Sequence, residues 1–342
     1  MKAAHGFSNF ALLSLIGMLF VAFVMPTAAA AQRPKTAAEK KKEAEAPPAK
    51  KADAAPKGDD DKDKPEVVDI PTEDGVLMRA TYFKSKMGKN APAVILLHGL
   101  GEKRGVFDEL AFDLQDRGYA VLSLDFRGHG KSTQWVAKPQ APPKAGAGKL
   151  DYHDLRTKEQ FLTLLNDIEA AKKFLVRRNN AQELNVAKLA VVGTEMGASL
   201  GILWSFKDWQ YTTTVGFTGK QGQDVQTLVL ISPKQNFNGL AISKELAYLQ
   251  QRMPIQVVAG KKETKVFSEA EKMYQSANKA RPNEPPASEL LDIDTKLQGS
   301  KLLDSEHFDV NKSIIKYLDV ALRQKAAPWA MREISEAEAA GP

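Results

Sequence analysis

Short apolar runs alternate with amphipathic helical segments along most of this 342-residue chain, and this alternation limits its fold more than any other feature. The run Ala93–Leu97 (AVILL) is continuous and apolar, which is typical of a strand buried on both faces. Residues 158–178 carry apolar side chains at helical spacing on one face. Alternating strand and helix units predict an α/β fold, with a mostly parallel central sheet and helices on both of its faces.

The expected elements follow one another from Val67 onward. Strands are predicted at Val76–Phe83, Ala93–Leu97, Tyr119–Leu124, Lys188–Val192, Val225–Ile231, Ile255–Ala259 and Leu290–Leu297. Helices are predicted at 105–117, 158–178, Met196–Phe206, 266–280 and 308–325. The sequence therefore predicts one folded domain over residues 66–326, followed by a polar C-terminal tail at 327–342.

The first 31 residues have the organisation of a signal peptide. Lys2 supplies a positive charge, and an uncharged apolar run extends from Phe10 to Met25. Ala29 and Ala31 are the small residues that a signal peptidase requires, with cleavage expected before Gln32. We expect an exported protein, periplasmic or extracellular. The alternative is an uncleaved N-terminal membrane anchor, because the segment approaches the roughly 20 residues of a spanning helix.

Residues 32–65 form a tether of Ala, Lys, Asp, Glu and Pro without aromatic or branched aliphatic residues. Such a segment cannot bury enough apolar surface to offset the entropy of ordering, so we expect disorder. Its ten basic and eight acidic residues, together with Lys2, supply half of the net charge of +6. The folded part is almost balanced and has no long basic block, which argues against nucleic acid as a partner.

The absence of cysteine limits the chemistry of the chain. It excludes a disulfide framework, a cysteine-ligated metal site and a thiol nucleophile. The sequence also contains no metalloprotease motif, P-loop or dinucleotide-binding motif, so no metal or cofactor is expected.

Three of the predicted strands are followed by loops of distinctive sequence. The strand Ala93–Leu97 runs into His98-Gly99-Leu100-Gly101, and the strand Tyr119–Leu124 runs into the loop DFRGHGKS at 125–132. The strand Lys188–Val192 runs into Gly193-Thr194-Glu195-Met196-Gly197. Together these loops resemble the α/β-hydrolase superfamily, specifically its esterase, lipase and serine-aminopeptidase-like branch, over about residues 68–325. The resemblance implies an oxyanion hole formed by the backbone N–H groups of Leu100 and Met196.

The nucleophile elbow is where the sequence departs from this family. The family pattern is G-x-S-x-G on a strand–turn–helix, and here Glu195 stands at the serine position. A match to G-x-S-x-G does occur four residues later, at Gly197–Gly201, with Ser199 at its centre. That match begins after the turn, so Ser199 is expected inside the helix, but it stays open as an alternative nucleophile.

A glutamate at the elbow favours loss of serine-type acyl transfer. Its carboxylate would occupy the oxyanion hole and repel a developing oxyanion. We therefore expect a binding or envelope-associated pseudoenzyme. The alternative is an active ester or acyl hydrolase that uses Glu195 as a carboxylate nucleophile or base, or Ser199 as the nucleophile.

The resemblance also implies the other two members of a triad. Glu263, in the loop after the strand IQVVA, matches the family's acid position. His307, in the sequence DSEHF before the last predicted helix, matches the family's histidine position. Glu263 as a solvated loop carboxylate is the alternative, since lysines surround it in the sequence.

Two segments of the sequence bear on the size and the polarity of a ligand. The connection Ser232–Met253 is too short for a large lid domain. The segment 204–224 contains Trp204, Trp209, Tyr211 and Phe217, which would suit either the core or an apolar pocket for a small-molecule or ester ligand.

Overall fold

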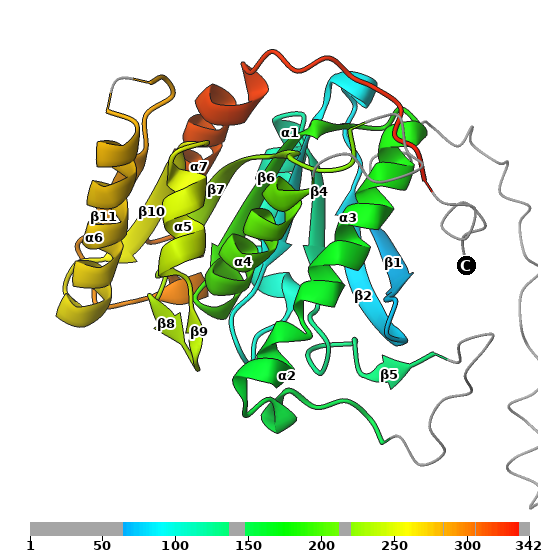
Figure 1. Ribbon diagram of the computed structural model, residues 1–342, viewed down its shortest axis with the longest axis horizontal. Helices are drawn as coiled ribbons and strands as arrows, with labels where there is room; N and C mark the ends of the chain where they lie inside the picture. The colour runs from blue at the N-terminus through cyan, green and yellow to red at the C-terminus, as the bar shows by residue number, and fades with distance from the viewer. Residues whose placement is uncertain (1–63, 137–147, 212–219, 283, 305, 335–342) are drawn as a thin grey trace, which may run out of the picture. The chain divides into compact units, whose positions relative to one another are not determined.

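A nine-stranded sheet forms the centre of the fold (Figure 1). The computed structural model describes residues 64–136, 148–211, 220–282, 284–304 and 306–334. The predicted signal peptide and all but the end of the predicted tether therefore lie outside the described residues. Within the described part of the chain, no helix combines the length and apolar character needed to cross a membrane.

The sheet has the order β1-β2-β4-β3-β6-β7-β10-β11, with β5 paired to β2, while β8 and β9 form a separate hairpin. The strands are β1 (Glu66–Pro71), β2 (Val76–Phe83), β3 (Pro92–Leu97), β4 (Ala120–Leu124), β5 (Gln134–Trp135), β6 (Asn185–Thr194), β7 (Val225–Ile231), β8 (Asn236–Phe237), β9 (Leu240–Ala241), β10 (Ile255–Gly260) and β11 (Glu289–Ile293). From β4 to β11 all neighbours are parallel, whereas β1, β2 and β5 pair in antiparallel fashion.

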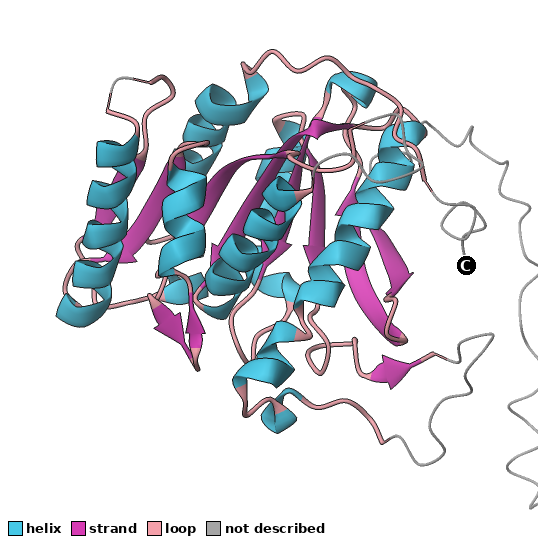
Figure 2. Cartoon of the chain, in the orientation of Figure 1, coloured by secondary structure: helices cyan, strands magenta, loops and turns pink. Residues whose placement is uncertain are grey.

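The helices cover both faces of the sheet (Figure 2). They are α1 (Asp108–Asp116), α2 (Lys158–Leu162), α3 (Leu165–Asn180), α4 (Met196–Gln210), α5 (Ser243–Gln250), α6 (Thr264–Ala280) and α7 (Val310–Leu318). Side chains of α3, α4, α5 and α6 share one hydrophobic core with the sheet, and side chains of α1 and α7 share a second core. This confirms the predicted α/β class, because every residue of β3, β4, β7 and β10 is buried between the two helical layers.

Two predicted elements differ from the observed ones. The helix predicted over 158–178 is broken after Leu162, because Thr163 makes tight bonds to Gln160: its N–H and its hydroxyl both donate to that carbonyl, at 3.1 and 2.7 Å. The strand predicted over Leu290–Leu297 ends at Ile293, where the N–H of Thr295 turns back to the Ile293 carbonyl.

The connection between β7 and β10 contains only the β8–β9 hairpin and α5. The aromatic rings of Phe237 in this hairpin and Phe161 in α2 meet edge to face, 5.6 Å apart. The hairpin is held near the carboxyl end of β7, where Gln235 N–H also bonds the Glu269 carboxylate of α6 at 2.8 Å. Lys234, which belongs to the site described below, lies in the loop between β7 and this hairpin.

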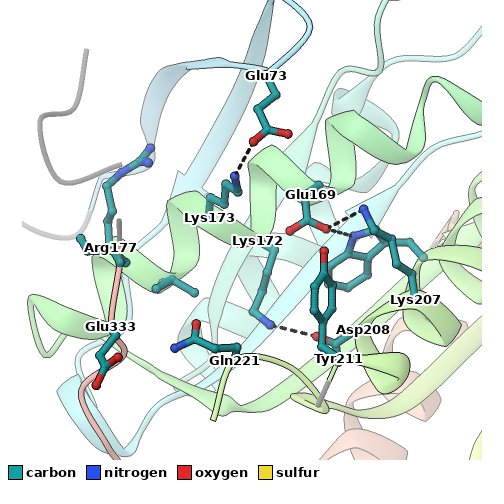
Figure 3. Close-up of a pocket in the computed structure, with 13 residues that line it drawn as sticks. Glu73, Glu169, Lys172, Lys173, Arg177, Lys207, Asp208, Tyr211, Gln221 and Glu333 are labelled. Carbon is teal, nitrogen blue, oxygen red and sulfur yellow. Dashed lines mark hydrogen bonds and ion pairs between the residues drawn. The ribbon is translucent and has the colours of Figure 1, made fainter. Parts of the chain in front are cut away.

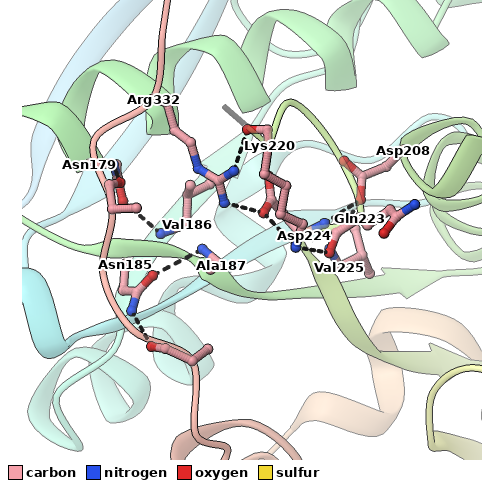
Figure 4. A network of polar contacts seen from close by, with 12 residues as sticks. Asn179, Asn185, Val186, Ala187, Asp208, Lys220, Gln223, Asp224, Val225 and Arg332 are labelled. Atoms are coloured by element: carbon pink, nitrogen blue, oxygen red, sulfur yellow. Dashed lines mark hydrogen bonds and ion pairs between the residues drawn. The ribbon is translucent and has the colours of Figure 1, made fainter. Parts of the chain in front are cut away.

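The C-terminal residues 327–334 pack on the domain, beyond its predicted boundary at residue 326. Side-chain amides of Asn179, Asn180 and Asn185 donate to the carbonyls of Ala330, Arg332 and Ala327 respectively. The Arg332 guanidinium reaches the buried Asp224 carboxylate at 2.5 Å (Figure 4). Lys172 pairs with the same carboxylate at 2.8 Å. The predicted polar tail thus begins as an integral part of the fold.

Candidate functional site

The turn between β6 and α4 has the strained geometry expected of the elbow, with Glu195 at its centre. Glu195 has φ 43° and ψ −100°, a conformation that L side chains rarely adopt. Two glycines allow the helix to leave the strand so sharply. A methyl group on Gly197 would lie 2.1 Å from the Leu97 carbonyl oxygen, and one on Gly193 would lie 2.5 Å from the Gly197 backbone. The G-x-E-x-G register is therefore the one that forms the turn.

Ser199, the alternative nucleophile, lies in the first turn of α4. It is fully buried, and its hydroxyl donates to the Glu195 carbonyl at 3.4 Å, as expected for a serine within a helix. An ester carbonyl could not reach this hydroxyl without displacement of α4 or its neighbours.

The Glu195 carboxylate lies between two loops and pairs with a third. Its Oε1 is 3.2 Å from Lys234 Nζ, and the two side chains are 32% and 37% exposed. A methyl group on Gly299 would come within 3.3 Å of its Oε2, and one on Gly99 within 3.5 Å. The carboxylate is thus flanked by the His98-Gly99 loop and by the loop after β11. The ion pair with Lys234 was not foreseen from the sequence.

A second carboxylate, also missed in the sequence, occupies the His98-Gly99 loop. Glu102 Oε2 accepts the Gly99 N–H at 2.7 Å and faces the Thr194 hydroxyl at 3.4 Å, while the Ser300 hydroxyl donates to Oε1. These contacts join the loops after β3, β6 and β11. Glu102, and not Glu195, is the carboxylate that receives a backbone N–H of this loop.

The two expected oxyanion-hole donors stand at the expected places in the chain. Met196 begins α4 directly after Glu195, and Leu100 follows Gly99 in the loop. Among the hydrogen bonds of the described residues, none uses the N–H of Leu100 or of Met196. Both groups therefore remain available as donors. The expectation that the Glu195 carboxylate occupies the oxyanion hole is wrong for the described residues, because this carboxylate pairs with Lys234 instead.

His98 fixes the His98-Gly99 loop to the loop DFRGHGKS at 125–132. Its Nε2 accepts the Phe126 N–H at 3.1 Å, so Nδ1 carries the proton and donates to the Gly99 carbonyl at 2.7 Å. The ring is fully buried, and burial lowers the pKa of His98 to about 4, with a further lowering from nearby His129. The neutral His98 side chain thus holds the two loops in position.

Gln298 and Gly299 occupy the part of the β11 loop that faces the elbow. The Gln298 carboxamide accepts the Ser232 hydroxyl at 2.7 Å and donates to the Gly260 carbonyl at 2.8 Å, bridging the ends of β7 and β10. The Ser232 hydroxyl in turn accepts the Gly299 N–H at 2.8 Å. Sequence reasoning missed this pair, although Gln298 follows the last strand by only five residues.

His307 and Glu263 lie in exposed positions. His307 precedes α7, and its side chain is 67% exposed, with Nδ1 at 2.9 Å from Asp304 Oδ2. Glu263 is exposed at the start of α6, where its carbonyl accepts the Phe267 N–H. No hydrogen bond or ion pair within the described ranges joins Glu195, Glu263 and His307 to one another.

One group of side chains has the composition of a metal site. Ligand atoms of Asp304, Glu306 and His307 lie within 4.8 Å of one another. All three residues are exposed, and Asp304 is already bonded to His307.

Two pockets flank the sheet. A pocket of about 490 Å³ opens beside Glu102, between the His98-Gly99 loop and Leu150–His153, with Val106 and Tyr152 in its wall. A pocket of about 250 Å³ lies toward the C-terminal end of α4, where Trp204 and Tyr211 stand among Lys172, Lys173 and Glu169 (Figure 3). Trp204 is buried and donates to Glu169 at 3.1 Å, so it belongs to the core as well as to this charged pocket. Phe217 lies outside the described residues.

Comparisons with solved structures support the fold. The chain is similar to a Pyrococcus furiosus esterase, with a TM-score of 0.53 and 20% identity over 80% of this chain and 96% of that one. It is also similar to a dienelactone hydrolase from Anabaena variabilis, with a TM-score of 0.51 and 15% identity over 76% and 98% of the two chains. At these identities the likeness concerns the fold alone.

Among curated proteins, the chain is similar to uncharacterised proteins of two Mycobacterium tuberculosis strains, CDC 1551 / Oshkosh and H37Rv. Each is 28% identical over 133 residues, which is 39% of this chain and 38% of the relative. The family model of the serine aminopeptidases S33 matches residues 88–282, more than half of the chain and including β3, the elbow and β10. The protein therefore belongs to the serine aminopeptidase S33 family of the α/β-hydrolase superfamily.

Proposed function

We propose that this family member lacks serine-hydrolase activity and acts as an exported binding protein. One observation carries the proposal: the strained elbow position presents the Glu195 carboxylate, ion-paired with Lys234, instead of a serine hydroxyl. A carboxylate at this position repels the oxyanion that a hydrolase of this family must stabilise. Ser199 offers no substitute, because its hydroxyl is buried inside α4.

Turnover of a panel of p-nitrophenyl esters tests this proposal. Wild type, Glu195→Gln and Ser199→Ala should all release p-nitrophenol at the rate of a matched heat-unfolded sample. Turnover by wild type that disappears in Ser199→Ala would refute the proposal in favour of a displaced serine nucleophile.

A carboxylate mechanism is the second candidate, since Glu195 is about one-third exposed on the turn that carries the nucleophile in this superfamily. Its ion pair with Lys234 would lower the nucleophilicity of the carboxylate, which favours the first candidate. If this second candidate holds, wild type turns over esters, Glu195→Gln abolishes the turnover, and Ser199→Ala leaves it intact.

The proposed ligand is a small molecule of ester size bound in the pocket of about 490 Å³ beside Glu102. The wall residues Val106, Leu150 and Tyr152 supply apolar contact there, and Lys103 and Lys149 supply positive charge. Calorimetry with p-nitrophenyl esters should show binding to wild type and weaker binding to Tyr152→Ala. Equal affinity for both proteins would exclude this pocket.

Export is proposed from the signal-like residues 1–31. Expression of the full chain in a bacterial host followed by mass spectrometry of the mature protein tests it. The expected N-terminus is Gln32. A membrane-bound protein that retains Met1 would support the anchor instead.

A further inference from the structure

Gln298 lies in the loop after the last strand, next to Gly299, which lies against the Glu195 carboxylate. A base must reach the nucleophile at the elbow from the loop after the last strand, within hydrogen-bonding distance. In this chain the residue of that loop against the Glu195 carboxylate is Gly299, and its neighbour Gln298 is tied to the ends of β7 and β10. His307 is nine residues further along, exposed and bonded to Asp304.

A carboxamide cannot act as a general base as an imidazole does. The Gln298 side chain has no group that accepts a proton near neutral pH, and its oxygen and nitrogen are already bonded to Ser232 and Gly260. It acts as a positioning residue, because the same Ser232 hydroxyl that binds it also holds the Gly299 N–H at 2.8 Å.

We infer that the site departs from a working hydrolase at two independent positions, 195 and 298, and that both must change before acyl-ester hydrolysis appears. This inference rests on the proposed function, since it takes wild type to be inactive. It goes beyond that function in assigning the base position to Gln298 rather than His307. It also implies that the remaining framework is competent, because the Leu100 and Met196 N–H groups have no hydrogen-bond partner among the described residues.

The latent reaction is ordinary acyl transfer. In the double variant Glu195→Ser/Gln298→His, the new serine hydroxyl adds to the ester carbonyl while its proton passes to the new imidazole. The proton then goes to the departing oxygen as the carbon–oxygen bond breaks, which leaves an acyl-enzyme and the free alcohol. Water attacks the acyl-enzyme by the same proton route and releases the carboxylic acid and the serine.

The experiment compares p-nitrophenyl acetate turnover by wild type, Glu195→Ser, Gln298→His and the double variant, each checked for folding by circular dichroism. The double variant should exceed Glu195→Ser by about 10² to 10⁴-fold, the usual contribution of a general base. Its rate should rise with pH as an imidazole near pKa 6.5 loses its proton, a profile that Glu195→Ser alone should not show.

Two results overturn the inference. One is a Glu195→Ser variant as active as the double variant, above all if its activity falls in Glu195→Ser/His307→Gln. The other is a folded double variant with no gain over Glu195→Ser.

A variant that shortens Gln298 gives a second test if the double variant does not fold. In Glu195→Ser/Gln298→Ala, free imidazole added to the solution should increase turnover and the effect should saturate. The increase should be smaller in Glu195→Ser, because Gln298 fills the space that the imidazole would occupy. Equal increases in the two variants would contradict the assignment of the base position to Gln298. If wild type itself turns over the ester, and Glu195→Gln or Ser199→Ala removes that turnover, the proposed function has failed.

Discussion

Single side chains decide the chemistry at the carboxyl edge of the sheet. The backbone at position 195 has the strained geometry of a nucleophile elbow, yet the side chain that it presents is a carboxylate bonded to Lys234. Glu102 holds the adjacent loop through the Gly99 N–H and the Ser300 hydroxyl. The fold of an α/β hydrolase thus presents a paired carboxylate at the turn between β6 and α4.

His98 makes the stability of this region depend on pH. Its pKa in the folded protein is about 4, below the value near 6.5 expected in the unfolded chain. Because the pKa is lowered on folding, the unfolded state binds the proton more readily than the folded state. The contribution of His98 to the free energy of unfolding is therefore complete above pH 6.5 and is lost as the pH falls toward 4. The total loss should be about 3 kcal/mol.

Urea unfolding at a series of pH values measures this contribution. Between pH 6.5 and 4, wild type should lose more stability than His98→Gln. The exposed His153 serves as the matched control, so His153→Gln should follow wild type. Parallel curves for wild type and His98→Gln would contradict a buried neutral imidazole.

At the scale of elements, the elbow depends on close contact between α4 and β3. Gly197→Ala would place a methyl group 2.1 Å from the Leu97 carbonyl oxygen, a backbone atom that cannot turn aside. We expect a loss of more than about 3 kcal/mol of stability, as for other severe overpacking. Gly201→Ala is the control within the same helix, since its methyl group would meet only side-chain atoms, at 3.0 and 3.3 Å.

Thermal unfolding distinguishes the two variants. Gly201→Ala should stay close to wild type, because the gain of about 1 kcal/mol in helix propensity offsets the tighter packing. If Gly197→Ala melts at the temperature of Gly201→Ala, the close approach of α4 to β3 does not stabilise the elbow.

The C-terminal segment stabilises the opposite end of the sheet through Arg332. Arg332→Met removes one of the cations around buried Asp224 and should cost about 3 kcal/mol, because it weakens the compensation of a buried charge. Lys220 pairs with the same carboxylate at 3.5 Å but is 46% exposed. Lys220→Met should therefore cost less than about 1 kcal/mol. Equal costs in urea unfolding would show that Arg332 acts as a surface residue.

For the whole molecule, the sequence predicts the architecture well and the site only in part. The buried strands of the sheet are recognisable because they are continuous apolar runs, and the elbow register follows from β6, which ends at Thr194 directly before Glu195. The break after Leu162 and the early end of β11 depend on local hydrogen bonds that the apolar pattern does not record.

The partners of Glu195 lie far from it in sequence. Lys234 reaches the elbow from the loop after β7, and Gly299 does so from the loop after β11, so only the folded sheet brings these residues together. His307 and the earlier Gln298 both agree with the family's chain order, so chain order alone does not decide which of them holds the position of a base. Gln298 is the closer of the two to the end of the last strand.

The wild-type protein should present no activated serine. Intact-mass spectrometry after incubation with an alkyl fluorophosphonate measures this, because the reagent adds covalently to activated serines. We expect no increase in mass for wild type, while an active serine esterase in the same tube is labelled completely. A single adduct on wild type, mapped to Ser199 and absent from Ser199→Ala, would contradict it.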